Sequence, residues 1–155
     1  MKNDKVVYVG LSADILHEGH INILKIANSY GKVIVGLLTD EAIASYKNIP
    51  YLSFKQRKVV LENLKYVNNV IAQKTLDYVD NLNLIKPDYV VHGNDWKSGV
   101  QKKTRDRVIK TLKKWSGKLI EPKYTENISS TIIKNKISEV LSPENRVSRL
   151  KRLIN

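Results

Sequence analysis

The sequence predicts an α/β fold, in which helices cover both faces of a doubly wound, parallel sheet of five strands. One observation behind this prediction is that strand-like and helix-like segments alternate along nearly the whole chain, as crossover connections between parallel strands require. Another is that the strand-like segments are short and rich in β-branched residues, which is typical of buried strands. We expect one domain over residues 1–141 and a basic helix or linker over residues 142–155.

The first half of the chain supplies three predicted strands, Val6–Val9, Lys32–Leu38 and Asn69–Ala72. The connecting helices have recognisable ends: a glycine follows the first, a Thr-Asp cap precedes the second, and a capping box opens the third. These helices are His20–Ser29, Glu41–Tyr46 and Ser53–Val67.

The second half supplies two more predicted strands, Asp88–His92 and Lys118–Glu121. A helix over Tyr78–Ile85 is closed by a proline, and a basic amphipathic helix over Lys102–Trp115 ends at Ser-Gly. The last predicted helix, Ser130–Leu141, begins at a serine cap and stops before Ser-Pro.

Charge is the unusual feature of the composition. The chain has 27 Lys and Arg against 15 Asp and Glu, a net charge of +12, and residues 101–155 hold 15 of the basic but 5 of the acidic side chains. Such a field favours nucleic acid, a membrane surface or phosphorylated small molecules as partners. Because this basic third offers two aromatic side chains, Trp115 and Tyr124, and no nucleic-acid motif, we favour a phosphate-handling enzyme.

Composition also excludes several classes of protein. The chain has no cysteine, which rules out disulfides, thiolate zinc sites and cysteine nucleophiles. Its apolar stretches, such as Val33–Leu38, are too short to span a bilayer. We therefore expect a cytoplasmic domain with neither a membrane nor a nucleic acid as partner.

Ligands of doubly wound sheets collect at the carboxyl ends of the strands. Three polar segments follow strands here: Gly10–His20, Gly93–Trp96 and Thr125–Thr131. In the first, His17-Glu18-Gly19-His20 opens a helix, where free N–H groups and the helix dipole attract phosphate. The two imidazoles would then clamp nucleotide phosphates, with Gly19 permitting a close backbone approach. A metal site of His17, His20 and His92, and histidines that merely cap the helix, are the alternatives.

Four blocks in the right order give the chain a resemblance to the HxGH nucleotidyltransferase superfamily, and within it to the glycerol-3-phosphate and choline-phosphate cytidylyltransferases. They are Ser12–His20, Thr39-Asp40-Glu41 through Lys47 to Arg57-Lys58, His92–Trp96 and Thr125–Thr131. Residues 125–131 are similar to the signature Arg-Thr-Glu-Gly-Ile-Ser-Thr-Thr, although Tyr124 replaces its arginine and Asn127 its glycine. The phrases Gly36–Tyr46 and Tyr89–Trp96 resemble the nucleotidyltransferase domains associated with phosphoenolpyruvate mutase in phosphonate biosynthesis. The tail resembles the lead-in to such a mutase domain, and an ordinary basic helix is the other interpretation.

This resemblance implies a Rossmann-like nucleotidyltransferase that uses CTP and Mg²⁺, the ion being held through the CTP phosphates, with Asp14 as an optional ligand. The implied reaction transfers CMP to a small phosphonate, 2-hydroxyethylphosphonate or 2-aminoethylphosphonate, and releases pyrophosphate. Glycerol 3-phosphate or phosphocholine is the alternative acceptor, and an ATP-dependent adenylyltransferase is a further one. A non-catalytic nucleotide- or RNA-binding module is the alternative from another class. Family relatives commonly form homodimers, so we expect one here.

The resemblance also assigns site residues. The implied catalytic residues are His17, His20, Lys47 and Arg57. The implied nucleotide-binding residues are Ser12, Ala13, Asp14, Gly19, His92, Asp95, Trp96, Thr125, Ile128, Ser129, Ser130 and Thr131. The acceptor would meet Lys47, Asp77 and Tyr78, with Asp77 able to pair with an ammonium or instead to cap a helix.

Overall fold

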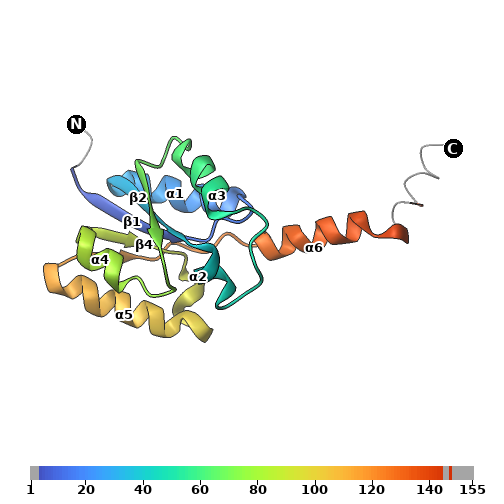
Figure 1. Cartoon of the computed structure of the whole chain (residues 1–155). Coiled ribbons are helices and arrows are strands. Elements are labelled where there is room, and N and C mark those ends of the chain that lie inside the picture. Colours follow the sequence, from blue (N-terminus) through green and yellow to red (C-terminus); the bar gives the residue numbers. More distant parts are fainter. Residues whose placement is uncertain (1–3, 145–146, 148–155) are drawn as a thin grey trace.

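A parallel sheet forms the centre of the molecule. The computed structural model describes residues 4–144 and 147 (Figure 1). Its five strands are β1 (Val6–Leu11), β2 (Lys32–Leu38), β3 (Asn69–Gln73), β4 (Tyr89–Val91) and β5 (Lys118–Ile120). They are all parallel and run in the order β3-β2-β1-β4-β5, which confirms the predicted fold class.

The six predicted α-helices are all present among the described residues. They are α1 (Glu18–Tyr30), α2 (Asp40–Ala44), α3 (Phe54–Glu62), α4 (Val79–Ile85), α5 (Lys102–Leu112) and α6 (Ser130–Leu141). Short 3₁₀ turns follow β4 at Asn94–Lys97 and Gly99–Gln101, and another, Lys113–Trp115, extends α5.

Helix α3 is shorter than predicted, because the chain tightens after Glu62. The backbone N–H groups of Asn63 and Leu64 each bond to the carbonyl three residues earlier, and the Asn63 side chain donates to the carbonyl of Val59 at 2.8 Å. These bonds replace the α-helical pattern, so the predicted extension to Val67 is wrong.

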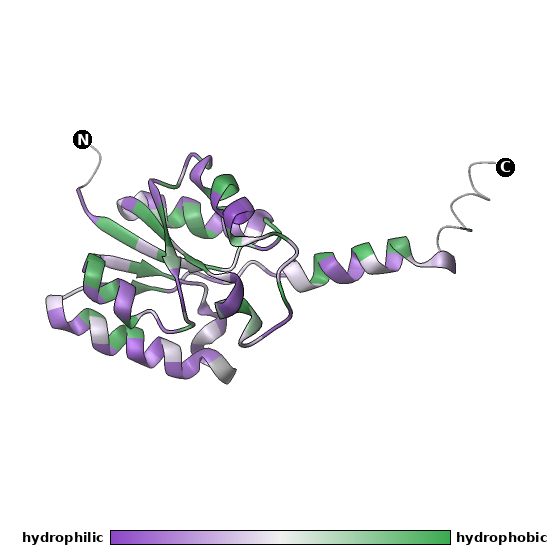
Figure 2. Ribbon diagram, in the orientation of Figure 1, coloured by the Kyte–Doolittle hydropathy of each residue, from purple (hydrophilic) through white to green (hydrophobic). Residues whose placement is uncertain are grey.

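Two hydrophobic cores lie on opposite faces of the sheet. Along β1, Val7 and Val9 pack with Leu24 of α1, whereas Tyr8 between them packs on the other face with Leu82 of α4. This alternation is the period of two that a strand imposes. Figure 2 shows largely hydrophobic strands at the centre, while polar residues follow the outer surface of α5. The prediction of helices on both faces is therefore confirmed.

The connection from β3 to β4 creates a switch point. The chain first builds β1, β2 and β3 outward in one direction, and then returns to place β4 on the other side of β1. The segments that leave the carboxyl ends of β1 and β4 therefore diverge, and open a crevice between them.

Helix α6 extends away from the sheet (Figure 1), and none of its residues is buried. It ends at Leu141. The predicted basic segment 142–155 lies outside the described residues apart from 142–144 and 147. Within the described part of the chain, no helix combines the length and the apolar character needed to cross a bilayer.

Candidate active site

A cavity of about 280 Å³ lies at the switch point. It is lined by residues that follow β1 and β4, by the loop after α2 and by the start of α6. The sequence-predicted residues that line it are Ser12, His17, Gly19, His20, Lys47, Tyr78, His92, Asp95, Trp96, Thr125, Ser129, Ser130 and Thr131. The structure thus brings the three predicted polar segments together at one edge of the sheet.

The two histidines of the His-Glu-Gly-His motif cap helix α1. The N–H of Gly19 donates to Nδ1 of His17 at 3.1 Å, and the N–H of His17 donates to Nδ1 of His20 at 3.3 Å. Both Nδ1 atoms are therefore acceptors, so a neutral ring carries its proton on Nε2. Capping and ligand binding are thus compatible roles, since the cap uses one nitrogen of each ring.

Both imidazoles are held in the neutral form. Burial, together with the neighbouring His17 and the Lys47 ammonium, lowers the pKa of His20 to about 4. Burial also lowers the pKa of His17, although Glu18 opposes the shift. The ring centroids are 4.0 Å apart. The site therefore presents two N–H donors side by side, without placing two positive charges at that separation.

Lys47 supplies a positive charge to the same cavity. Its Nζ donates to Oγ of Ser12 at 3.1 Å and lies 5.1 Å from the centre of the Tyr46 ring. The side chain comes from segment 45–53, which has no helix or strand and follows α2.

The opposite wall of the cavity is an aromatic stack. His92 and Trp96 lie face to face, with centroids 3.8 Å apart and planes within 8°. Trp96 is 1% exposed, and its Nε1–H donates to Oε1 of Glu121 at 2.8 Å. Arg105 holds the same carboxylate with two bonds, of 2.7 and 2.9 Å. Glu121 and Arg105 thereby fix the orientation of the indole.

His92 adopts the tautomer opposite to that of the histidine pair. Its Nδ1 lies 2.8 Å from the carbonyl of Gly93, and a carbonyl only accepts, so Nδ1 carries the proton. Burial lowers the pKa of His92 against the opposing effects of Gly93, Asp95 and Glu121. The neutral ring then offers the lone pair of Nε2, which suits a hydroxyl or amino group of a ligand.

The third segment turns into the start of α6. Ser129 caps the helix by accepting from the N–H of Ile132 at 3.1 Å, and Ser129, Ser130 and Thr131 line the cavity. Asn127 has φ of +62°, a left-handed conformation that glycine and asparagine adopt most readily. An asparagine in the place of the signature's glycine therefore preserves the turn. Tyr124, in the place of the signature's arginine, also lines the cavity.

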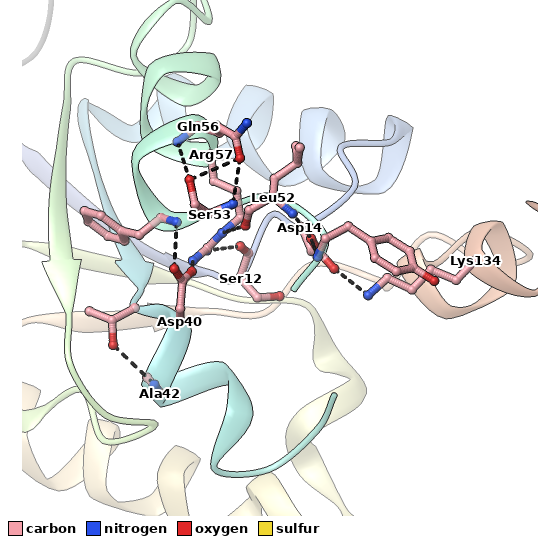
Figure 3. Close-up of polar contacts among 12 residues, drawn as sticks. Ser12, Asp14, Asp40, Ala42, Leu52, Ser53, Gln56, Arg57 and Lys134 are labelled. Carbon is pink, nitrogen blue, oxygen red and sulfur yellow. Dashed lines mark hydrogen bonds and ion pairs between the residues drawn. The ribbon is translucent and has the colours of Figure 1, made fainter. Parts of the chain in front are cut away.

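Arg57 is not placed to meet a substrate. Its side chain is fully buried and donates to three protein oxygens: the Leu52 carbonyl at 3.0 Å, the Ser12 carbonyl at 2.6 Å and Asp40 Oδ1 at 2.7 Å (Figure 3). It does not line the cavity. In this structure Arg57 is bound by the protein itself, and the geometry does not support its predicted catalytic role.

Asp77 and Asp14 are also engaged elsewhere. Asp77 pairs with Arg107 of α5 at 2.6 Å and accepts from the N–H of Val79, the first residue of α4, so its carboxylate is already paired within the protein. Asp14 is 2% exposed and is bound by the backbone of segment 45–53 and by Lys134. Neither carboxylate lines the cavity, and the same holds for Ala13 and Ile128.

The described residues contain no cluster of three or more His, Cys, Asp or Glu placed to hold a metal. This finding does not support the three-histidine site, and the bonds of Asp14 do not fit a magnesium ligand. Sequence reasoning missed several polar side chains of the lining, among them Tyr46, Gln73, Gln101 and Thr104. Gln73 ends β3 and could have been found as a polar residue at a strand end.

A Rossmann-like sheet with a histidine pair, a lysine and a helix N-terminus around its switch point defines a nucleotidyltransferase fold. Solved structures below 25% identity share this fold. The lipopolysaccharide core biosynthesis protein of Thermoplasma volcanium has a TM-score of 0.66 at 23% identity and covers 79% of this chain and 98% of its own. Pantothenate synthetase of Thermus thermophilus has a TM-score of 0.58 at 14% identity, and the match covers 93% of this chain and 64% of that protein.

The chain belongs to the cytidylyltransferase-like family, whose model matches residues 8–136. It is 37% identical over 130 residues to ethanolamine-phosphate cytidylyltransferase of Dictyostelium discoideum, covering 81% of this chain but 34% of that protein. Glycerol-3-phosphate cytidylyltransferase of Staphylococcus aureus is 34% identical over 80% of this chain and 88% of its own. The Bacillus subtilis enzyme of that name is 34% identical, and the match covers 86% of this chain and 97% of that enzyme. The predicted enzyme class is thereby confirmed.

Proposed function

We propose that this chain transfers CMP from CTP to a small phosphate monoester and releases pyrophosphate. The observation that carries the proposal is the convergence of two neutral histidines, one lysine and the N-terminus of α6 on one cavity. The names of the relatives described above support a phosphate monoester as acceptor. The resemblance of Tyr89–Trp96 to phosphonate enzymes keeps 2-hydroxyethylphosphonate and 2-aminoethylphosphonate as second candidates.

The reaction asks the protein for positioning and charge stabilisation. An oxygen of the acceptor's phosphate forms a bond to the α-phosphorus of CTP, while the bond from that phosphorus to the bridging oxygen of pyrophosphate breaks. In our proposal, His17 and His20 donate their Nε2–H groups to phosphate oxygens on which negative charge accumulates. Lys47 and the N–H groups at the start of α6 add positive potential.

The lining favours an acceptor without a positive charge. Asp95 is the one carboxylate among the lining residues described by the structure, and it lies beside His92, 3.8 Å from its Nδ1. The part of the lining nearer β2 and β3 holds Leu38, Tyr46, Gln73 and Leu76. An ammonium group there would have no counter-charge from a lining residue, whereas hydroxyl groups could bond to polar side chains. We therefore rank glycerol 3-phosphate above phosphoethanolamine and phosphocholine.

Mg²⁺ is part of the proposal as an ion that enters on the CTP phosphates. When bound there, it neutralises phosphate charge. The described residues do not form a site for it, so we assign no protein ligand and no step to the ion.

The test is pyrophosphate release in the presence of Mg²⁺, with CTP or ATP combined with each acceptor. The acceptors are glycerol 3-phosphate, phosphoethanolamine, phosphocholine, 2-hydroxyethylphosphonate and 2-aminoethylphosphonate, and His17→Ala is the blank. We expect a signal that requires CTP and is strongest with glycerol 3-phosphate. A signal confined to a phosphonate would overturn the choice of acceptor and retain the reaction. A signal that ATP supports better than CTP would refute cytidylyl transfer.

A further inference from the structure

We propose that Lys134 of α6 is a positioning residue, which holds the Lys47-bearing segment 45–53 over the active site through the buried carboxylate of Asp14. This inference rests on the proposed function for the role of Lys47, and on the geometry alone for the link between α6 and the segment.

Segment 45–53 depends on a few polar contacts for its position. Eight of its nine residues are exposed and the ninth, Pro50, is half-buried, so burial of apolar side chains contributes little to its stability. The far end of the segment is held instead by Asp14, whose Oδ1 accepts from the N–H of Tyr51 at 2.7 Å and from that of Leu52 at 3.2 Å. Arg57 adds a bond to the Leu52 carbonyl (Figure 3).

Asp14 in turn depends on Lys134. The carboxylate is 2% exposed, and its Oδ2 has no hydrogen-bond partner among the described residues other than the ion pair with Lys134 Nζ. A buried carboxylate oxygen that loses its cation is costly, so the side chain must take up a proton or turn toward solvent. Either change weakens or breaks the two bonds from Asp14 to segment 45–53.

Lys134 also contacts the segment directly. Its Nζ lies 4.3 Å from the centre of the Tyr51 ring, within the range of a cation–π interaction. One lysine on the first turns of α6 therefore contacts both the carboxylate and the segment that this carboxylate holds. Ser130 adds a second attachment of α6, by donating to the Ile15 carbonyl at 3.2 Å.

The residue before Asp14 has an unusual backbone conformation. Ala13 is buried and has φ of +48°, a conformation that residues with a side chain seldom adopt. This left-handed residue sits between Ser12, which contacts Lys47, and Asp14, which holds the segment. The turn after β1 thus connects both ends of segment 45–53 to the body of the protein.

The first test measures amide hydrogen exchange in the absence of substrate. Lys134→Met retains the length of the side chain without its charge, Lys134→Arg restores the charge, and Lys136→Met is the matched control on the exposed side of the same helix. We expect the Tyr51 and Leu52 amides to exchange at least about tenfold faster in Lys134→Met, with Lys134→Arg and Lys136→Met close to wild type. Unchanged exchange at these two amides would overturn the proposal. So would an equal acceleration at the β1 amides, because that result would mean general destabilisation.

The second test is a double-mutant cycle on kcat/KM with Lys47→Met. If Lys134 acts through the position of Lys47, the double variant should be no slower than Lys47→Met alone, whereas independent roles would multiply the two losses. Multiplying losses would refute the positioning role. An inactive wild-type enzyme would refute the proposed function but not the link between α6 and the segment, which the exchange experiment decides alone.

Discussion

Replacing Glu121 by Gln should make the protein less stable in a way that depends strongly on pH. The Arg105 guanidinium, which donates two hydrogen bonds to Glu121, and the indole N–H of Trp96 hold the pKa of this carboxyl at about 2, against an ordinary value of 4.5 and against the effect of burial. Its side chain is 13% exposed and that of Arg105 is 24% exposed, so water screens the pair only in part.

The pKa shift sets the magnitude of the effect. A difference of this size corresponds to about 3 kcal/mol at most, and allowing for screening we expect a loss of about 2–3 kcal/mol near neutral pH. Because the pKa is lower in the folded state, this stabilisation is complete above about pH 4.5 and is lost as the pH falls toward 2. The difference between wild type and Glu121→Gln should therefore shrink with acidification.

Urea denaturation at several pH values between about 3 and 7 measures this difference. Glu126→Gln is the control, because Glu126 forms a surface pair with Lys123 in which the side chains are 66% and 79% exposed. Such a pair contributes about 0–1 kcal/mol, so the control should stay close to wild type at every pH. A stability difference for Glu121→Gln that is the same at both ends of the pH range would refute the reasoning. A loss as small as that of the control would refute it too.

Three further predictions concern the site and the residues that support it. NMR measurement of the ring ¹⁵N shifts should show that His20 stays neutral down to about pH 5 with its proton on Nε2. The same measurement should show a neutral His92 with its proton on Nδ1. If both rings had the same tautomer, the hydrogen bonds described above would be contradicted. Arg57→Lys should lower the free energy of unfolding by about 3–5 kcal/mol, because a buried lysine cannot reproduce the three directed hydrogen bonds of the guanidinium. A variant that lost activity at unchanged stability would instead indicate that Arg57 contacts the substrate. Asn127→Ala should lower the free energy of unfolding by about 1–2 kcal/mol because of the positive φ, whereas Asn127→Gly should be close to neutral. Thermal denaturation of the two variants measures this difference, and equal effects would exclude backbone strain as the cause.

The fold can be predicted from sequence because its signals are local. Every predicted strand agrees with the structure to within two residues at each end, since β-branched runs bounded by turns or caps specify strands without reference to the rest of the chain. The histidine pair can be located for the same reason, as a motif that opens a helix after a strand. The end of α3 escapes prediction because Asn63 ends the helix through bonds that a hydrophobic pattern does not reveal.

The predicted site residues that the structure places outside the cavity include three charged residues, whose surroundings depend on distant partners. Arg57 and Asp77 are compatible by type with binding phosphate and ammonium, but Asp40 and Arg107 satisfy them first. Asp14 is satisfied by Lys134, 120 positions along the chain. Sequence identifies which side chains could meet a ligand. The tertiary structure decides which of them the protein has already paired.

The crevice also lies over a seam of the sheet, by which we mean the short pairing between β1 and β4. Strand β1 pairs with β2 from Val6 to Leu11, but with β4 only at Val7 and Tyr8. The histidine pair and Lys47 belong to the half of the chain before this seam, whereas His92, Trp96 and the start of α6 belong to the half after it. A ligand that touches both walls is therefore a cross-link between the two halves, and part of its binding energy resists their separation.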